Sequence, residues 1–145
     1  MALRIAKVEL DKLRLHGEES YARECCGVLV GDISEDGVKH VYSAVRCVNT
    51  HTDSAQAFYN IDPVELRRVE RDAIRRGYNI VGFYHSHPDW PARWSQNDLE
   101  EAHWTGCSYV ITSVQRGQAK ETNSFDLVGE EEKKRFEAEE IQVDV

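Results

Sequence analysis

Residues 78–98, YNIVGFYHSHPDWPARWSQND, change from an apolar to a polar sequence partway along. Residues 78–87 are mostly apolar, which is typical of a strand in the centre of a sheet. Pro88 favours an end to that strand, because proline cannot donate a hydrogen bond to a neighbouring strand. The SQND sequence from Ser95 to Asp98 is typical of a helix start. The stretch therefore predicts a central strand that carries histidines to the beginning of a helix.

The hydrophobic pattern on either side of this stretch indicates both strands and helices. Asp62 followed by Pro63 is typical of a helix start. The full prediction is a strand that begins within 2–10, strands over 25–33, 38–48, 57–61, 78–87, 107–114 and 124–128, and helices over 8–22, 63–77, 95–104 and 129–140. Strands and helices mix without strict alternation, so we expect an α/β (α+β) fold with a mixed β-sheet flanked by helices.

The bulk composition fits one globular domain over residues 1–145. The net charge of −8 argues against nucleic acid or a membrane as a partner, because both attract basic surfaces. We recognise no signal peptide and no apolar run of membrane-spanning length, so we expect a cytoplasmic protein. The cysteines lack C-x-x-C spacing and are predicted to be buried thiols: Cys25, Cys26, Cys47 and Cys107.

His85 and His87 are two residues apart at the end of the predicted strand 78–87. Side chains with this spacing point to the same face of a strand, so both imidazoles can reach one metal ion. Asp98, in the first turn of the next helix, can supply a carboxylate as third ligand. Two histidines and one carboxylate, with water in the fourth position, form a catalytic zinc arrangement. The spacing therefore predicts one Zn²⁺ per chain.

These residues also have simpler explanations. The two histidines can be polar residues at a strand end, and Ser95 with Asp98 can be a plain capping box. The combined spacing favours the metal site, because a helix start can also fix a serine and a carboxylate beside the histidines. His103 is off the helical face of Asp98, so we interpret it as a structural or surface residue.

The stretch HSHPDWPARWSQND resembles the JAMM motif of the MPN/JAB1/Mov34 metallopeptidase family, in its small prokaryotic type. Its H-x-H-P sequence and its serine and aspartate three residues apart match the motif. Upstream, RECCGVLVGD resembles the family's E-x-C-G-L-L-x-G segment, with Glu24 in the glutamate position. FYNIDP resembles the passage from strand to helix between these motifs. The resemblance implies the MPN fold, a curved mixed sheet flanked by helices and distantly like that of cytidine deaminase.

The resemblance also implies a role for each motif residue. His85, His87 and Asp98 bind zinc. Glu24 acts as general base toward the zinc-activated water and passes the proton to the leaving amine. Ser95 stabilises the oxyanion of the tetrahedral intermediate. The implied substrate is a ubiquitin-like or sulfur-carrier protein, whose C-terminal tail is cut at a peptide or isopeptide bond.

Further residues and further functions are more weakly indicated. Trp90 and Trp94 are candidates for binding the substrate tail, and packing against the core is an equal alternative. The acidic run 130–140 is predicted to be a solvated helix. The alternative functions are a non-catalytic MPN protein-binding module and a RadC-like DNA-associated protein. Either a monomer or a homodimer is compatible with the sequence.

Overall fold

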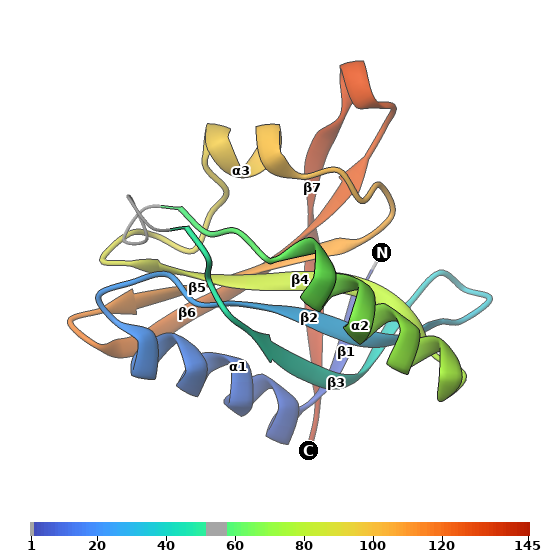
Figure 1. Cartoon of the computed structure of the whole chain (residues 1–145), viewed down its shortest axis with the longest axis horizontal. Helices are drawn as coiled ribbons and strands as arrows, with labels where there is room; N and C mark the ends of the chain where they lie inside the picture. The colour runs from blue at the N-terminus through green and yellow to red at the C-terminus, as the bar shows by residue number, and fades with distance from the viewer. Residues whose placement is uncertain (1, 52–57) are drawn as a thin grey trace.

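The computed structural model describes residues 2–51 and 58–145 and shows one curved sheet with three helices around it (Figure 1). The helices are α1 (Lys7–Ser20), α2 (Pro63–Arg75) and α3 (Gln96–Glu101). The strands are β1 (Ala2–Ala6), β2 (Cys26–Ile33), β3 (Lys39–Cys47), β4 (Asn79–Pro88), β5 (Ser108–Gln115), β6 (Gln118–Val128) and β7 (Arg135–Asp144). The predicted fold class, a curved mixed sheet flanked by helices, is confirmed.

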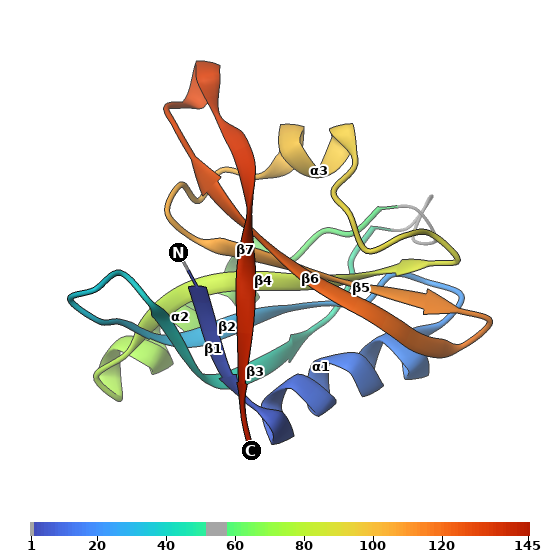
Figure 2. The ribbon, with the colours of Figure 1, turned by 180° about the vertical axis from the view of Figure 1, so that it is seen from behind.

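The sheet closes on itself in the order β1-β3-β2-β4-β5-β6-β7. The pairs β1–β3, β4–β5 and β1–β7 are parallel, and the other neighbouring pairs are antiparallel. The last closure joins β7 to β1, which run side by side at the front of Figure 2. Strand β4 lies between β2 and β5 and is buried along almost its whole length, as predicted from its apolar sequence.

The core lies on both faces of the central strands. On one face, Phe83 and Val28 pack with residues of α2 and β5. On the other face, Tyr84 and Leu29 pack with Leu13 of α1. Strand β4 is buried from residue 80 to residue 88 because the two helices cover opposite sides of it. The strand that carries the histidines is therefore held from both faces.

The predicted helix over 129–140 is wrong. Residues 131–133 form a short 3-10 turn, and Arg135–Asp144 is strand β7. Glutamate and lysine favour a helix when the chain is considered locally. Pairing with β6 and β1 overrides that preference, since strand formation depends on the neighbouring strands. The acidic run is thus a strand that completes the barrel and not a solvated helix.

Several smaller boundaries also differ from the prediction: β6 begins at Gln118 and not at residue 124, and β4 includes Pro88. Residues 58–61 have no regular secondary structure, so the strand predicted over 57–61 is wrong there, and Ala57 lies outside the described residues. The helix predicted over 95–104 is shorter, because α3 ends at Glu101. The four cysteines are free and buried, as predicted. Within the part of the chain that the structure describes, no helix is long and apolar enough to cross a membrane.

A buried ion cluster links β3 to β6 and β7. Lys39 Nζ lies 3.0 Å from Asp126 Oδ1 and 3.5 Å from Glu139 Oε2. The other oxygen of Glu139 accepts hydrogen bonds from the hydroxyls of Ser108 and Ser124. The Lys39 side chain is 4% exposed and that of Glu139 is 1% exposed. Because buried charges are tolerated only when they are paired, this cluster fixes how β7 closes the sheet.

Lys39→Ala should lower the free energy of unfolding by about 3–5 kcal/mol, because it leaves two carboxylates buried without their cation. Urea unfolding measures the loss. Lys7→Ala is the matched control, since Lys7 forms an exposed pair with Asp11 and such pairs contribute about 0–1 kcal/mol. Equal losses in the two variants would contradict the role of the cluster.

Candidate metal centre and catalytic site

His85 and His87 lie side by side at the end of β4. Their Nε2 atoms are 3.1 Å apart, and both residues are buried. His87 Nδ1 lies 3.1 Å from the carbonyl oxygen of Pro91. An N–H at Nδ1 that donates a hydrogen bond to that carbonyl leaves a lone pair at Nε2, on the side of His85. Burial lowers the pKa of His85, which keeps its imidazole neutral and able to bind a cation.

Asp98 reaches both imidazoles from the first turn of α3. Its Oδ1 lies 3.3 Å from His85 Nε2, and its Oδ2 lies 3.1 Å from His87 Nε2. The same carboxylate accepts a hydrogen bond of 2.8 Å from the backbone of Ser95, and Ser95 Oγ accepts one of 3.1 Å from the Asp98 backbone. The capping box and the histidine cluster are therefore both present. The two explanations of this pair are compatible.

Glu24 precedes β2 and is directed into the same cluster. Its carboxylate lies within 4.8 Å of the histidine nitrogens of both His85 and His87. The residue is 4% exposed, and Oε1 has no hydrogen-bond partner among the described residues. Burial, followed by the charge of Asp98, raises the pKa of Glu24 to about 9. The structure thus brings the predicted residue Glu24 to the histidines from 61 residues earlier in the chain.

The backbone holds Glu24 in this place. Cys26 pairs with His85 in the register of β2 and β4, so the residues before Cys26 lie beside the end of β4. Cys25 N donates a hydrogen bond of 2.8 Å to Ser86 Oγ, and Ser86 N donates one of 3.3 Å to Cys25 O. The side chain between the two histidines therefore anchors the residue that follows Glu24.

The cluster has the properties of a cation site. Two imidazoles and two carboxyl groups converge in a buried place, and Glu24 Oε1 lacks a donor among the described residues. Burial acts to raise the pKa of Asp98, but His85, His87 and the backbone of Ser95 hold it below its usual value. A divalent cation would supply the missing positive charge, and nitrogen with carboxylate oxygen suits zinc. The residues present therefore fit a metal ion.

A cleft of about 360 Å³ opens onto this cluster. Its lining residues are Glu24, Phe58, His87, Pro88, Trp90, Ser95, Gln96 and Asn97. Trp90 is 68% exposed, so its indole is available to a ligand. Trp94 lies elsewhere, with its ring 5.6 Å from the ring of Phe136 on β7. The structure places Trp90, but not Trp94, in the cleft wall.

Sequence reasoning missed the aromatic residues of the segment 58–61. The ring of Tyr59 stacks on that of His85 at 4.6 Å, and Phe58 lines the cleft. The available signal was the pair of aromatic residues in the FYNI sequence, which was interpreted as a strand with no part in the site. A second pocket of about 470 Å³ shares Phe58 and Asn97 with the cleft.

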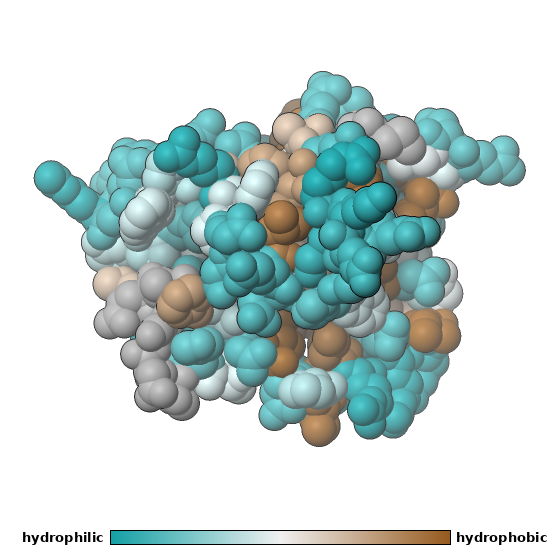
Figure 3. All heavy atoms as spheres, turned by 90° about the horizontal axis from the view of Figure 1, so that it is seen from above, coloured by the Kyte–Doolittle hydropathy of each residue, from teal (hydrophilic) through white to brown (hydrophobic). Residues whose placement is uncertain are grey.

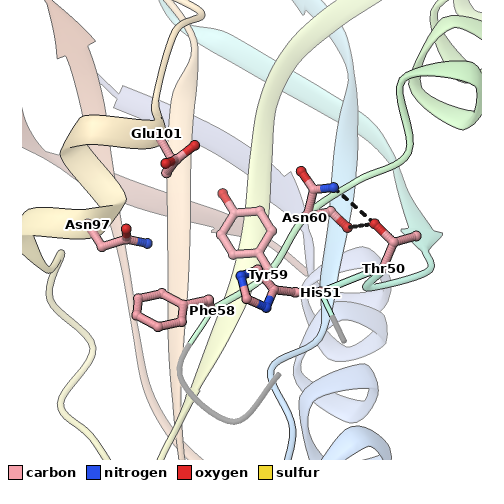
Figure 4. Close-up of a pocket in the computed structure, with 7 residues that line it drawn as sticks. All are labelled: Thr50, His51, Phe58, Tyr59, Asn60, Asn97 and Glu101. Atoms are coloured by element: carbon pink, nitrogen blue, oxygen red, sulfur yellow. Dashed lines mark hydrogen bonds between the residues drawn. The ribbon is translucent and has the colours of Figure 1, made fainter. Parts of the chain in front are cut away.

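Figure 4 shows the second pocket between α3 and the segment 58–61. Asn97 and Glu101 come from the α3 side, and Thr50, His51 and Asn60 come from the other side. The face of the molecule in Figure 3 is mostly hydrophilic, with hydrophobic side chains visible between polar ones. The site is therefore a groove in which Phe58 and Trp90 form apolar walls beside the buried cluster of histidines and carboxylates, with a more polar pocket next to it.

Curated relatives of the chain include enzymes that act on protein conjugates. A desampylase of Haloferax volcanii is 33% identical over 115 residues, which cover 77% of this chain and 80% of that protein. A probable TtuB-protein conjugate cleaving protease of Thermus thermophilus is 29% identical over 111 residues, covering 77% and 70%. The mouse deubiquitinase MYSM1 is 33% identical over 99 residues, but the match spans only 12% of its length.

Solved structures share the fold along almost the whole chain. A protein of Desulfitobacterium hafniense superposes with a TM-score of 0.82 at 25% identity, covering 98% of this chain and 92% of that one. A protein of Salinibacter ruber gives 0.74 at 34% identity, covering 97% and 91%. The family model of prokaryotic homologues of the JAB domain matches residues 6–128. The chain therefore belongs to the prokaryotic JAB family.

Proposed function

We propose that the chain is a zinc-dependent metallopeptidase that cleaves at the C-terminal tail of a ubiquitin-like or sulfur-carrier protein. The observation that carries the proposal is the buried cluster of His85, His87 and Asp98 with the carboxylate of Glu24 against it. Relatives named as a desampylase and as a TtuB-conjugate protease support a protein conjugate as substrate. The scissile bond is then a peptide or isopeptide bond that follows the tail.

His85, His87 and Asp98 would hold the zinc ion. Asp98 is a better ligand than Glu24 because its carboxylate oxygens lie 3.3 and 3.1 Å from the two Nε2 atoms, whereas the Glu24 carboxylate is only within 4.8 Å of the histidine nitrogens. When bound, zinc polarises a carbonyl and lowers the pKa of water to about 7. Asp98 is also fixed by the Ser95 backbone, so little ordering of side chains is needed on binding.

Glu24 would move the proton. It is buried and its pKa is raised, so it can hold a proton when no cation is near. A cation beside it would lower that pKa toward the operating pH, where a general base is most effective. Glu24 then accepts the proton of the attacking water and delivers it to the leaving amine. Both transfers take place at the same carboxylate.

Ser95 would stabilise the oxyanion. Its Oγ already accepts a hydrogen bond from the Asp98 backbone, which orients the hydroxyl. The hydroxyl proton is left to donate, and Ser95 lines the cleft. A donor fixed before the reaction stabilises developing negative charge without reorganisation.

The substrate tail would lie in the cleft beside Trp90. A Gly-Gly tail has almost no side chain to recognise, so hydrogen bonds to its main chain must supply much of the binding. The indole of Trp90 provides an apolar wall for such an extended tail. We assign this role to Trp90 and not to Trp94, which packs near Phe136.

Replacing a proposed ligand should remove the metal. Purified parent protein is expected to carry one zinc per chain, whereas His85→Ala and Asp98→Ala should lose it. Elemental analysis after dialysis measures the content. His103→Ala is the control, because His103 is exposed and paired with Glu131. Full zinc occupancy in either ligand variant would show that the ligand assignment is wrong.

Glu24→Gln should slow the reaction without removing the metal. Glutamine keeps the size of the side chain but cannot accept the proton, so kcat should fall about 10²–10⁴-fold. Zinc content and melting temperature should stay near those of the parent. Glu100→Gln, an exposed change on α3, should leave kcat unchanged. Loss of zinc from Glu24→Gln would instead make Glu24 a ligand.

Cleavage should require small residues at the C-terminus of the ubiquitin-like protein. We expect a ubiquitin-like protein with a Gly-Gly terminus to be cleaved from its partner, and one with two bulky terminal residues to be resistant. Glycine leaves room beside Trp90 and Phe58 for the main chain to approach the cluster. Equal rates on the two tails, compared by gel electrophoresis, would contradict recognition of an extended narrow tail.

A further inference from the structure

The side chain of Asn49, which follows β3, is fully used in hydrogen bonds to the backbone. Its Nδ2 donates to Glu24 O at 3.0 Å and to Phe58 O at 3.1 Å. Its Oδ1 accepts from His51 N at 3.0 Å and from Asn60 N at 3.1 Å. A carboxamide has two donors and room for two hydrogen bonds at its oxygen. Asn49 therefore has no capacity left and acts as a fixed connector.

One of these hydrogen bonds fixes the peptide group of Glu24. The oxygen of the Glu24–Cys25 peptide accepts from Asn49, and the N–H of the same peptide donates to Ser86 Oγ at 2.8 Å. A peptide group is planar, so bonds on its two edges fix its orientation. The direction in which the Glu24 side chain leaves the backbone depends on that orientation. Asn49 and Ser86 thus hold Glu24 from opposite sides.

The other three hydrogen bonds fix the wall of the groove. Phe58 lines the cleft, and Tyr59 stacks on His85 between the two residues that Asn49 contacts, Phe58 and Asn60. Thr50 also holds this wall, through hydrogen bonds with Asn60 that are drawn as dashed lines in Figure 4. Asn49 differs from Thr50 because it also reaches Glu24.

We propose that Asn49 is a positioning residue, which ties the general base Glu24 to the groove wall that carries Phe58 and Tyr59. This inference rests on the proposed function, since it assigns Asn49 a part in the same reaction. Displacing a catalytic group by about 1 Å can cost about 10²-fold in rate. Asn49 therefore contributes to kcat through Glu24 and to KM through the wall.

Asn49→Asp is the sharpest variant, because it keeps the shape but removes both donors. The new carboxylate oxygen faces the carbonyls of Glu24 and Phe58, which it repels. The probe is a ubiquitin-like protein whose C-terminal Gly-Gly is amide-linked to a fluorogenic amine. We expect kcat to fall about 10–100-fold, with one zinc per chain retained. Thr50→Val, which removes only wall hydrogen bonds, should change KM and leave kcat near that of the parent.

A double-mutant cycle separates positioning from a general loss of structure. If Asn49 acts through Glu24, Asn49→Asp should slow the parent but add little to Glu24→Gln, because the base it positions is already gone. If Asn49→Asp slows both backgrounds by the same factor, or slows neither, the inference is overturned. Circular dichroism checks folding, and Asn49→Ser replaces Asn49→Asp in the cycle if that variant does not fold.

The same four proteins test the proposed function separately from the role of Asn49. A parent that does not release the amine, or a Glu24→Gln variant as fast as the parent, overturns the function and the inference with it. The inference alone is overturned if the parent is active, Glu24→Gln is slow, and Asn49→Asp lowers the rate by the same factor in both backgrounds.

Discussion

The burial of the Glu24 carboxylate beside two imidazoles is the constraint on which the rest of the site depends. A second carboxylate, that of Asp98, lies in the same cluster, and Glu24 Oε1 has no donor in the described parts of the chain. Burying such groups is costly unless something compensates for it. A cation bound by His85, His87 and Asp98 would compensate, and it would also bring the pKa of Glu24 into a useful range.

The fold fixes each of these side chains through contacts with residues that lie outside the cluster. Strand β4 is covered on both faces, so the two histidines have little freedom. Asp98 is held by the capping box of α3. Glu24 is held by the hydrogen bonds of Asn49 and Ser86 to the Glu24–Cys25 peptide group. Preorganised groups need little rearrangement during a reaction, which is how a rigid fold lowers a barrier.

The sequence could predict the features that depend on local spacing. The histidines two apart on a strand and the capping box are patterns within a few residues, and both are present in the structure. Glu24 could be found only through its resemblance to a family motif, because it lies 61 residues before His85. The roles of Trp90 and Trp94 could not be separated in advance, because neighbouring residues in a loop can point to different partners.

Features that depend on distant partners could not be predicted. Strand β7 has the local composition of a helix and becomes a strand by pairing with β1 and β6. The partners of Asn49 are backbone groups, which carry no sequence signal of their own. The FYNI sequence predicts a strand, but residues 58–61 have no regular secondary structure, and their backbone is held by the side chains of Asn49 and Thr50.

The most direct test of the metal centre is the X-ray absorption spectrum of the zinc-loaded protein. The account predicts only nitrogen and oxygen neighbours at about 2.0–2.2 Å, with the outer-shell scattering of two imidazoles. Buried Cys25 and Cys26 are the alternative ligands to exclude, because Cys26 pairs with His85 between β2 and β4, and thiolates would give sulfur at about 2.3 Å. A sulfur shell, or the absence of imidazole scattering, would contradict a centre built from His85, His87 and Asp98.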